Sequence, residues 1–316
     1  MPGRWGEDLR AAGGPSVAGA SAGRGSVPSY PAPEGAVRAL ARVVEYSLWL
    51  RRPGKEDAGL LGAPVAEAQR LVNSIVKAHP DGHDLDVDEQ RELLAAYGID
   101  LWEARPVDSL EEAIAAAEDL GWDVVLKGTG DRHRNRPDLA HVRRELATPA
   151  DMEAAWRSLS KLINQETVQL VVQKMAPRGV PVQISSLEDP SFGPVVSFGI
   201  GGQMTELLND YAYRIPPLSE QDAADMVREI KSAPLLFGYR GMEVADVGAI
   251  ERLITCVARI QYDFPQVRSL SLPLVLAGPR GASVLTSAVR IEPVADPRSD
   301  WFVRRLSAPL GDTAPG

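Results

Sequence analysis

Apolar and polar positions along this chain follow two different periods, and their order predicts a mixed α/β (α+β) protein. Apolar residues at helical spacing predict helices over 34–52, 65–77, 88–97, 109–120, 148–161, 219–231 and 247–262. Short apolar runs predict strands at 101–104, 124–127, 142–146, 170–174, 181–187, 194–198, 270–276 and 282–291. The two kinds of element follow one another from residue 88 onwards, which favours one α/β domain of about 200 residues.

The regions outside this alternating pattern predict a simple domain organisation. Residues 1–30 are rich in Gly, Ala, Ser and Pro without periodicity, so we expect a disordered tail. A separate amphipathic helix is expected within 31–53, followed by a linker at 54–63. We place the folded domain at 64–293 and expect a largely unstructured tail at 294–316.

One stretch in the middle of the domain combines features of a ligand site. The strand predicted at 194–198 is followed by Gly199, Gly201 and Gly202, where the missing Cβ atoms let the backbone approach another group closely. The side chains that follow at a spacing of four would share one face if the segment were helical, and they are Glu206, Asp210 and Arg214. This order suits a phosphate and metal site, but the pattern alone favours ordinary packing of an α/β protein.

Composition narrows the functional classes. The 316 residues carry a formal net charge of -9, which argues against a nucleic-acid-binding surface. Cys256 is the single cysteine and lies in an apolar helical pattern, so we expect a small core residue and a reducing, cytoplasmic location. No apolar stretch approaches the roughly 20 residues that span a bilayer, so we do not expect the protein to associate with a membrane.

A set of motifs, taken in order, resembles one known family over about residues 64–293. The motifs are Leu93–Ile99, Val124–Lys127, Val171–Met175, Asp189–Val196, Gly199–Gly202, Pro217–Leu218, Pro234–Leu236 and Gly238–Gly241, with Glu206, Asp210 and Arg214 between them. Together they resemble the ATP-grasp domain of the ADP-forming acyl-CoA (acetate–CoA) ligases, a domain that also occurs fused to GNAT acetyltransferases. The resemblance implies an ATP-grasp fold of two α+β lobes, at about 86–165 and 166–293. The helix within 31–53 is similar to the last helix of the CoA-ligase domain that precedes this module.

The resemblance also implies an activity and a set of site residues. The family reaction converts acid, CoA and ATP to acyl-CoA, ADP and phosphate, with Mg²⁺ neutralising charge on the phosphates. Lys127 matches the lysine that contacts phosphate, although a lysine at a strand end can also be merely solvated. The other positions matched to the nucleotide are Gln173, Gly199, Gly201, Gly202 and Arg214, and those matched to the metal are Glu206 and Asp210. For Glu206, Asp210 and Arg214, structural salt bridging is an equal alternative. No catalytic residue is assigned.

Several polar positions depart from the family pattern. Asn135 occupies the position of a histidine that can carry phosphate, and Pro181 replaces a glutamate. Acidic and amide positions that would hold a hard cation become Leu270–Leu274 and Thr286–Ala288. The resemblance therefore supports two hypotheses. The first is the ATP-binding module of an ADP-forming acid–CoA ligase, working with a CoA-binding ligase domain or subunit. The second is a non-catalytic nucleotide-sensing or scaffold domain of a protein-acetyltransferase assembly, with a GNAT domain as partner.

Overall fold

The computed structural model describes residues 30–50, 65–129, 142–163, 169–189, 192–201 and 209–294. Contacts divide the chain into two units, Met1–Glu56 and Asp57–Gly316. The predicted tail at 1–30, the linker at 54–63 and most of the tail at 294–316 lie outside the described residues. None of the helices in the described ranges is long and apolar enough to cross a membrane.

The first unit contributes one described helix, α2 (Pro33–Leu50). It begins with Pro33 at its first turn, where a missing backbone N–H costs nothing. Apolar side chains repeat along it at helical spacing, and Val37, Leu40 and Val44 are all exposed. The predicted amphipathic helix is therefore present.

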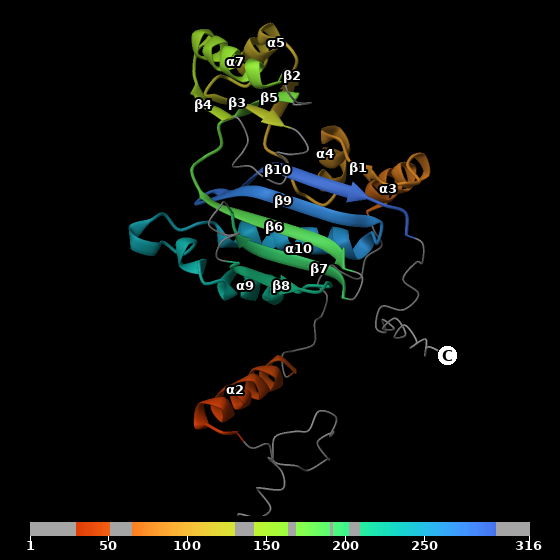
Figure 1. The fold of residues 1–316 in the computed structure, drawn as a ribbon, viewed down its shortest axis with the longest axis vertical. Coiled ribbons are helices and arrows are strands. Elements are labelled where there is room, and N and C mark those ends of the chain that lie inside the picture. Colours follow the sequence, from red (N-terminus) through yellow and green to blue (C-terminus); the bar gives the residue numbers. More distant parts are fainter. Residues whose placement is uncertain are drawn as a thin grey trace, which may run out of the picture. The chain divides into compact units, whose positions relative to one another are not determined.

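The second unit contains two sheets (Figure 1). The four-stranded sheet has the order β2-β5-β3-β4, and every pairing within it is antiparallel. Its elements are β2 (Ala104–Val107), α5 (Leu110–Asp119), β3 (Val124–Thr129), β4 (Val142–Leu146), α7 (Pro149–Ile163) and β5 (Gln169–Lys174). α5 and α7 pack on one face of this sheet around Leu126, Met152 and Val172, which are fully buried.

The six-stranded sheet has the order β1-β10-β9-β6-β7-β8, again with antiparallel pairings. Its strands are β1 (His83–Asp84), β6 (Val180–Asp189), β7 (Gly193–Ile200), β8 (Tyr211–Arg214), β9 (Val267–Gly278) and β10 (Gly281–Ile291). The accompanying helices are α3 (Ala66–Ala78), α4 (Val87–Ala95), α9 (Glu220–Glu229), η2 (Ala233–Leu235), η3 (Tyr239–Gly241) and α10 (Val247–Asp263).

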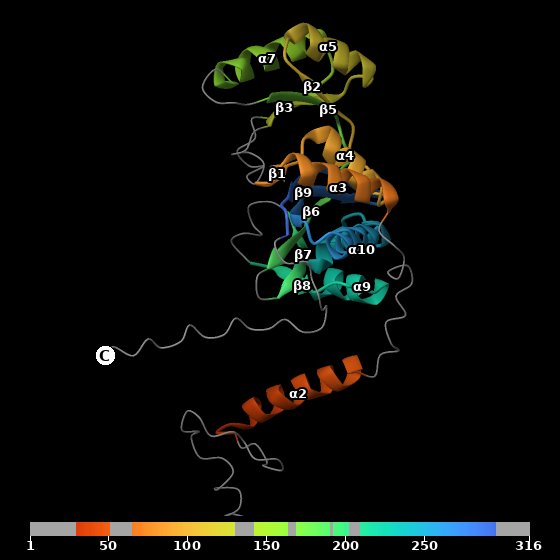
Figure 2. The ribbon, with the colours of Figure 1, turned by 90° about the vertical axis from the view of Figure 1, so that its right-hand side faces the viewer.

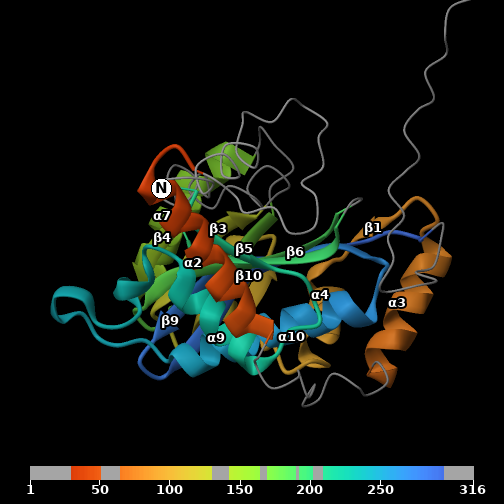
Figure 3. The ribbon, with the colours of Figure 1, turned by 90° about the horizontal axis from the view of Figure 1, so that it is seen from below.

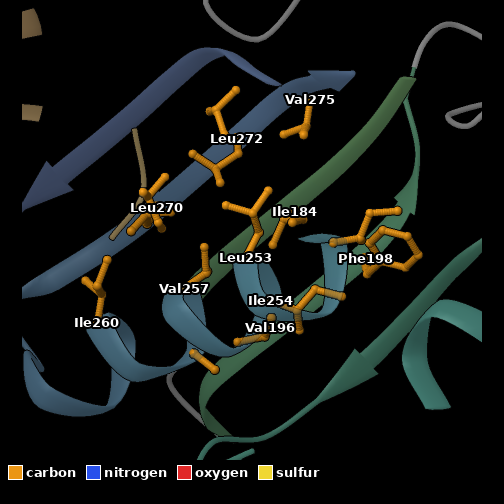
Figure 4. Close-up of a cluster of buried hydrophobic side chains, with 14 of the residues drawn as sticks. Ile184, Val196, Phe198, Leu253, Ile254, Val257, Ile260, Leu270, Leu272 and Val275 are labelled. Atoms are coloured by element: carbon orange, nitrogen blue, oxygen red, sulfur yellow. The ribbon is translucent and has the colours of Figure 1, made fainter. Parts of the chain in front are cut away.

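α10 covers one face of the six-stranded sheet and forms the larger core with it. Figure 4 shows the side chains of Ile184, Phe198 and Leu272 from the sheet packed against Ile254 and Val257 from α10. Figures 2 and 3 show α9 beside α10 on this same face. Because strand side chains alternate between faces, the residues between these apolar positions project from the face that α10 does not cover.

Helix starts follow local capping chemistry. Ser109 accepts a hydrogen bond from the Glu112 backbone N–H, which confirms it as the cap of α5. The Glu112 carboxylate accepts from the Asp108 N–H. Ser219 and Asp222 form a reciprocal capping box at the start of α9.

The structure corrects three local predictions. The strand expected at 101–104 is shifted to β2 (Ala104–Val107), with Leu101 forming an isolated bridge to Val284. Pro106 is tolerated in β2 because this strand is at the edge of its sheet. β1 and β8 were not predicted, and β8 shows that the backbone around Arg214 is extended rather than helical. Cys256 is partly buried against the larger core, as expected for a small packing residue.

Candidate functional site

Lys127 projects from β3 on the face that α5 and α7 do not cover. Its strand neighbour Leu126 points into the core of the four-stranded sheet, so Lys127 points the opposite way. Its Nζ lies 3.4 Å from the carbonyl oxygen of Leu285 in β10. Burial between the two sheets disfavours the charged amine and lowers the pKa of Lys127 to about 8. Phosphate oxygens arriving here would stabilise the protonated amine.

Gln173 joins the same place from β5. Its side chain is buried, and its Nε2 donates to the carbonyl oxygens of Leu285 at 3.2 Å and of Trp102 at 3.4 Å. The Trp102 backbone N–H donates to Val284 at 2.8 Å, while the Trp102 indole donates to the Lys174 carbonyl. Lys127 and Gln173 from the four-stranded sheet, and Trp102 just before β2, therefore contact β10 at Leu285 and Val284. The register of β10 shifts here, as in a β-bulge. We refer to these contacts as the Leu285 junction.

The face of the six-stranded sheet opposite α10 carries neutral polar side chains at its centre. The hydroxyls of Ser185 and Ser271 lie 3.0 Å apart, and Ser197 donates to the Ser185 carbonyl. On the neighbouring positions the Gln183 amide donates to the Tyr211 hydroxyl at 2.6 Å. We call this set, Gln183, Ser185, Ser197, Tyr211 and Ser271, the serine face. Its groups supply hydrogen bonds without formal charge.

Asp210 lies immediately before β8, and its carboxylate binds the backbone at the start of the segment that follows α9. Its two carboxylate oxygens accept hydrogen bonds from the backbone N–H groups of Lys231 and Ser232, each at 2.8 Å, and from the Ser232 hydroxyl. Burial raises the pKa of Asp210, but the Ser232 hydroxyl and the two backbone donors outweigh burial and leave it below its usual value. The prediction that Asp210 binds a metal stays a prediction; a cation there would compete with three hydrogen bonds.

Arg214 lies in β8 and forms an ion pair with Glu229, with 2.6 Å between the guanidinium Nη2 and the carboxylate. Glu229 is the last residue of α9, so this pair ties the edge strand to the helix. Arg214 therefore forms the structural salt bridge that was the alternative to nucleotide binding. Its predicted contact with nucleotide remains a prediction.

The two described glycines of the motif lie where backbones approach closely. A Cβ on Gly199 would lie 2.9 Å from the Asp210 carbonyl oxygen, and one on Gly201 would lie 3.3 Å from the Pro181 carbonyl carbon. Gly201 also donates its N–H to the Pro181 carbonyl at 2.7 Å. Packing within the sheet thus explains both glycines. Gly202 and Glu206 lie outside the described residues.

The positions that depart from the family pattern are partly visible. Asn135 lies outside the described residues. Pro181 accepts the Gly201 hydrogen bond through its carbonyl, while Ser287 donates to Gln90 at 2.6 Å. The Thr286 hydroxyl oxygen, next to the Leu285 junction, is buried without a hydrogen-bond partner in the described structure. In the described ranges, no group of three or more His, Cys, Asp or Glu side chains could hold a metal ion.

Sequence reasoning missed a second polar cluster, which fastens the turn after α4 to α10. The Tyr97 hydroxyl donates to Asp263 at 2.6 Å, and Arg259 Nε lies 2.8 Å from both Asp263 oxygens. Burial, reinforced by the Asp263 carboxylate, raises the pKa of Tyr97. Arg259 and Asp263 are spaced four residues apart on α10, and that spacing was the available signal.

Comparison with known proteins places the fold. A family model described as an ATP-grasp domain matches residues 78–291. The 4-hydroxybutyrate–CoA ligase (ADP-forming) of Nitrosopumilus maritimus is 29% identical over 273 residues, which cover 84% of this chain and 38% of that protein. Subunit beta of the ADP-forming acetate–CoA ligase I of Pyrococcus furiosus is 28% identical over 218 residues, which cover 67% of this chain and 93% of the subunit.

A solved structure supports the same assignment. The dinucleotide-forming acetyl-coenzyme A synthetase 1 of Ca. Korarchaeum cryptofilum, in complex with coenzyme A and Mg-AMPPCP, matches with a TM-score of 0.58 and 32% identity. The match covers 71% of this chain and 100% of that chain. These similarities confirm the two-lobed α+β fold expected from the motifs. The chain belongs to the ATP-grasp domains of the ADP-forming acyl-CoA ligase family.

Proposed function

We propose that this chain is the ATP-binding module of an ADP-forming acid–CoA ligase. The complete reaction would convert acid, CoA and ATP to acyl-CoA, ADP and phosphate. The chain spans 38% of the Nitrosopumilus ligase but 93% of the Pyrococcus beta subunit, so the module occurs in relatives both within a longer protein and as a subunit. We therefore propose that it works with a CoA-binding ligase domain or subunit, in the cytoplasm. A GNAT partner remains a prediction from the family resemblance.

The position of Lys127 carries this proposal. ATP-grasp ligases use ATP with Mg²⁺, and nucleotide phosphates need a cationic partner that a folded protein can position. Among the described residues, no carboxylate pairs with the Lys127 amine, and its one described acceptor is the Leu285 carbonyl. A buried amine without an acid partner gains most when an anion binds beside it.

The remaining predicted residues are assigned different roles in this proposal. Gln173 holds the Leu285 junction next to Lys127, so it would fix the amine's position and contact nucleotide from the same strand face. Gly199, Gly201, Gly202 and Arg214 are proposed to line the nucleotide, and Glu206 to approach its metal. The described donor set does not fit a cation held by several protein carboxylates, because Asp210 is engaged and the serine face is neutral.

Titration calorimetry of the full chain with Mg-ATP tests this function. We expect saturable binding that Lys127→Ala weakens at least about tenfold, since the charged hydrogen bond to phosphate is lost. Lys174→Ala is the matched control, because Lys174 also lies in a strand of the same sheet, at the end of β5, but is exposed. Unaltered binding in Lys127→Ala would contradict the assigned role of the amine.

A second experiment addresses the reaction itself. Purified chain would be mixed with a separately expressed CoA-binding subunit of a relative, an acid, CoA and ATP, and ADP release would be followed. ADP formation that depends on both CoA and acid supports the ligase function. Nucleotide binding without turnover in such mixtures would favour the nucleotide-sensing alternative.

A further inference from the structure

We infer that the apolar face of α2 is a docking surface, and that it binds in an apolar groove of the CoA-binding ligase domain or subunit proposed above. The inference rests on the proposed function for the identity of this partner. It goes beyond that function because it assigns the contact to one helix of the first unit, outside the residues that the ATP-grasp model matches.

The first observation is the apolar surface of α2. Its large apolar side chains have exposed fractions from 48% to 65% in the described structure, and they are Val37, Leu40, Val43, Val44, Tyr46 and Leu48. Contiguous exposed apolar surface is typical of a site where another surface binds. An isolated helix of 18 residues is also only marginally stable in water, so burial of this face by a partner would stabilise α2.

The second observation is the width of this face, which decides what kind of partner can cover it. Successive residues of an α-helix are turned by about 100°, so the large apolar side chains, from Tyr46 round to Leu48, span an arc of about 200°. The seam between two paired helices is much narrower, so one helix from a second copy of this chain would cover only part of the face. A groove in a folded domain can cover all of it.

The third observation is the charge on the remaining arc of α2. The charged residues Glu34, Arg38, Arg42 and Glu45 lie within an arc of about 80°. Arg42 and Glu45 form an exposed ion pair, with 2.9 Å between the guanidinium Nη1 and the carboxylate. These charges are therefore suited to face water at the rim of the groove while the apolar arc is buried in it.

Comparison with relatives indicates which protein supplies the groove. The Pyrococcus beta subunit matches 67% of this chain, which is about the length of the ATP-grasp model at 78–291. The longer Nitrosopumilus ligase matches 84% of this chain. The residues after 291 are too few to account for the difference, so the additional similarity reaches back into the first unit, Met1–Glu56. The first unit thus resembles ligase sequence beside the ATP-grasp module, which favours the rest of the ligase as the partner.

Hydrogen–deuterium exchange tests the inference on two proteins. The first is the full chain alone, and the second is the Nitrosopumilus ligase in which this whole chain replaces the matched part. We expect the backbone amides of 33–50 to exchange at least about tenfold more slowly in the chimera than in the chain alone. Rapid exchange of these amides in a chimera that binds both CoA and ATP overturns the inference and leaves the proposed function intact.

Slow exchange in the chain alone also overturns the inference, because the face is then covered without the partner. Sedimentation of the chain would show whether a second copy covers it. Failure of the chain to bind ATP in calorimetry would instead contradict the proposed function, and the identity of the partner with it. The two failures are therefore distinguishable.

Two substitutions in the chimera identify the face that docks. Leu40→Glu places a carboxylate near the middle of the apolar arc, so exchange over 33–50 should return to within about threefold of the rate in the chain alone. Arg38→Glu is the matched control, because Arg38 lies on the charged arc of the same helix and its replacement should leave exchange slow. ATP binding should be unchanged in both variants, since the second unit is intact. Equal exchange in the two variants would overturn the assignment of the apolar face.

Discussion

Lys127 and Gln173 donate to the same atom: the amine and the amide lie 3.4 Å and 3.2 Å from the carbonyl oxygen of Leu285. The two donors come from neighbouring strands of the four-stranded sheet, and the acceptor belongs to the six-stranded one. The proposed phosphate-binding residue is therefore also part of the Leu285 junction. A phosphate that draws the amine away would leave Gln173 to maintain the contact.

Replacing Gln173 with leucine should weaken both stability and ATP binding. Gln173→Leu keeps the volume but removes two donors from a buried site, and we expect a loss of about 1–3 kcal/mol in the free energy of unfolding. Chemical denaturation and ATP titration would measure the two effects. Gln221→Leu, which removes an exposed bond to Asp225, should change neither quantity appreciably.

The affinity for ATP should fall as the pH rises through about 8, where the folded protein releases the Lys127 proton. Phosphate stabilises the protonated amine, so binding near this pH should take up a proton, which calorimetry in buffers of different ionisation enthalpy can detect. Lys127→Ala should remove this pH dependence. A flat affinity profile in the unaltered chain would contradict the position assigned to the amine.

The lowered pKa of Lys127 has the opposite effect on the free energy of unfolding, which should rise with pH in this range. The unfolded chain keeps the Lys127 proton up to its ordinary pKa of 10.5, whereas the folded protein releases it near 8. Between these values the unfolded state binds more protons, so the contribution of Lys127 to stability rises with pH. Denaturation midpoints measured across this window, with Lys127→Ala as reference, would show it.

Asp210→Asn should destabilise the fold by about 1–3 kcal/mol, because one amide N–H₂ would face backbone donors that now meet a carboxylate oxygen. The pKa of Asp210 lies below its usual 3.8, so its stabilisation is present above that pH and is lost as the pH falls through the folded-state value. Acid unfolding of the two proteins, followed by circular dichroism, would compare them. An equal acid response would argue against the cap.

A methyl group at Gly199 should disturb the strand pair β7–β8. In Gly199→Ala the new Cβ would lie 2.9 Å from the Asp210 carbonyl oxygen, so the backbone must shift, and we expect a cost of about 1–3 kcal/mol. Gly248→Ala is a suitable contrast: Gly248 lies in α10 with ordinary space around its Cβ, and alanine favours a helix. In thermal unfolding, Gly199→Ala should lower the midpoint temperature and Gly248→Ala should raise it.

The periodic part of the fold could be predicted from sequence because burial of apolar faces determines it. The apolar positions of α10, such as Ile254 and Val257, appear in the sequence at helical spacing and pack on the sheet as expected. β8 could not be recognised in the same way. Its four residues become a strand through pairing with β7, the preceding strand, and so short a run carries little pattern of its own.

The candidate site was less accessible to sequence reasoning. Lys127 was identified through its motif, but the group that it contacts is a backbone carbonyl, and backbone acceptors leave no residue-type signature. Asp210 and Arg214 have a spacing that suits a site, while their partners Ser232 and Glu229 come from the other end of a helix. Only the folded arrangement reveals that those side chains are occupied.

The Leu285 junction also has a consequence for the order of assembly. It belongs to β10, which additionally pairs with β1 near the beginning of the folded unit. On the ribosome, His83 and Asp84 are made about two hundred residues before their partners Ile291 and Arg290. A nascent polypeptide halted before residue 281 would leave β1 unpaired and the Lys127 amine without its acceptor, so the six-stranded sheet and its contact with the four-stranded sheet are completed only when β10 has been made.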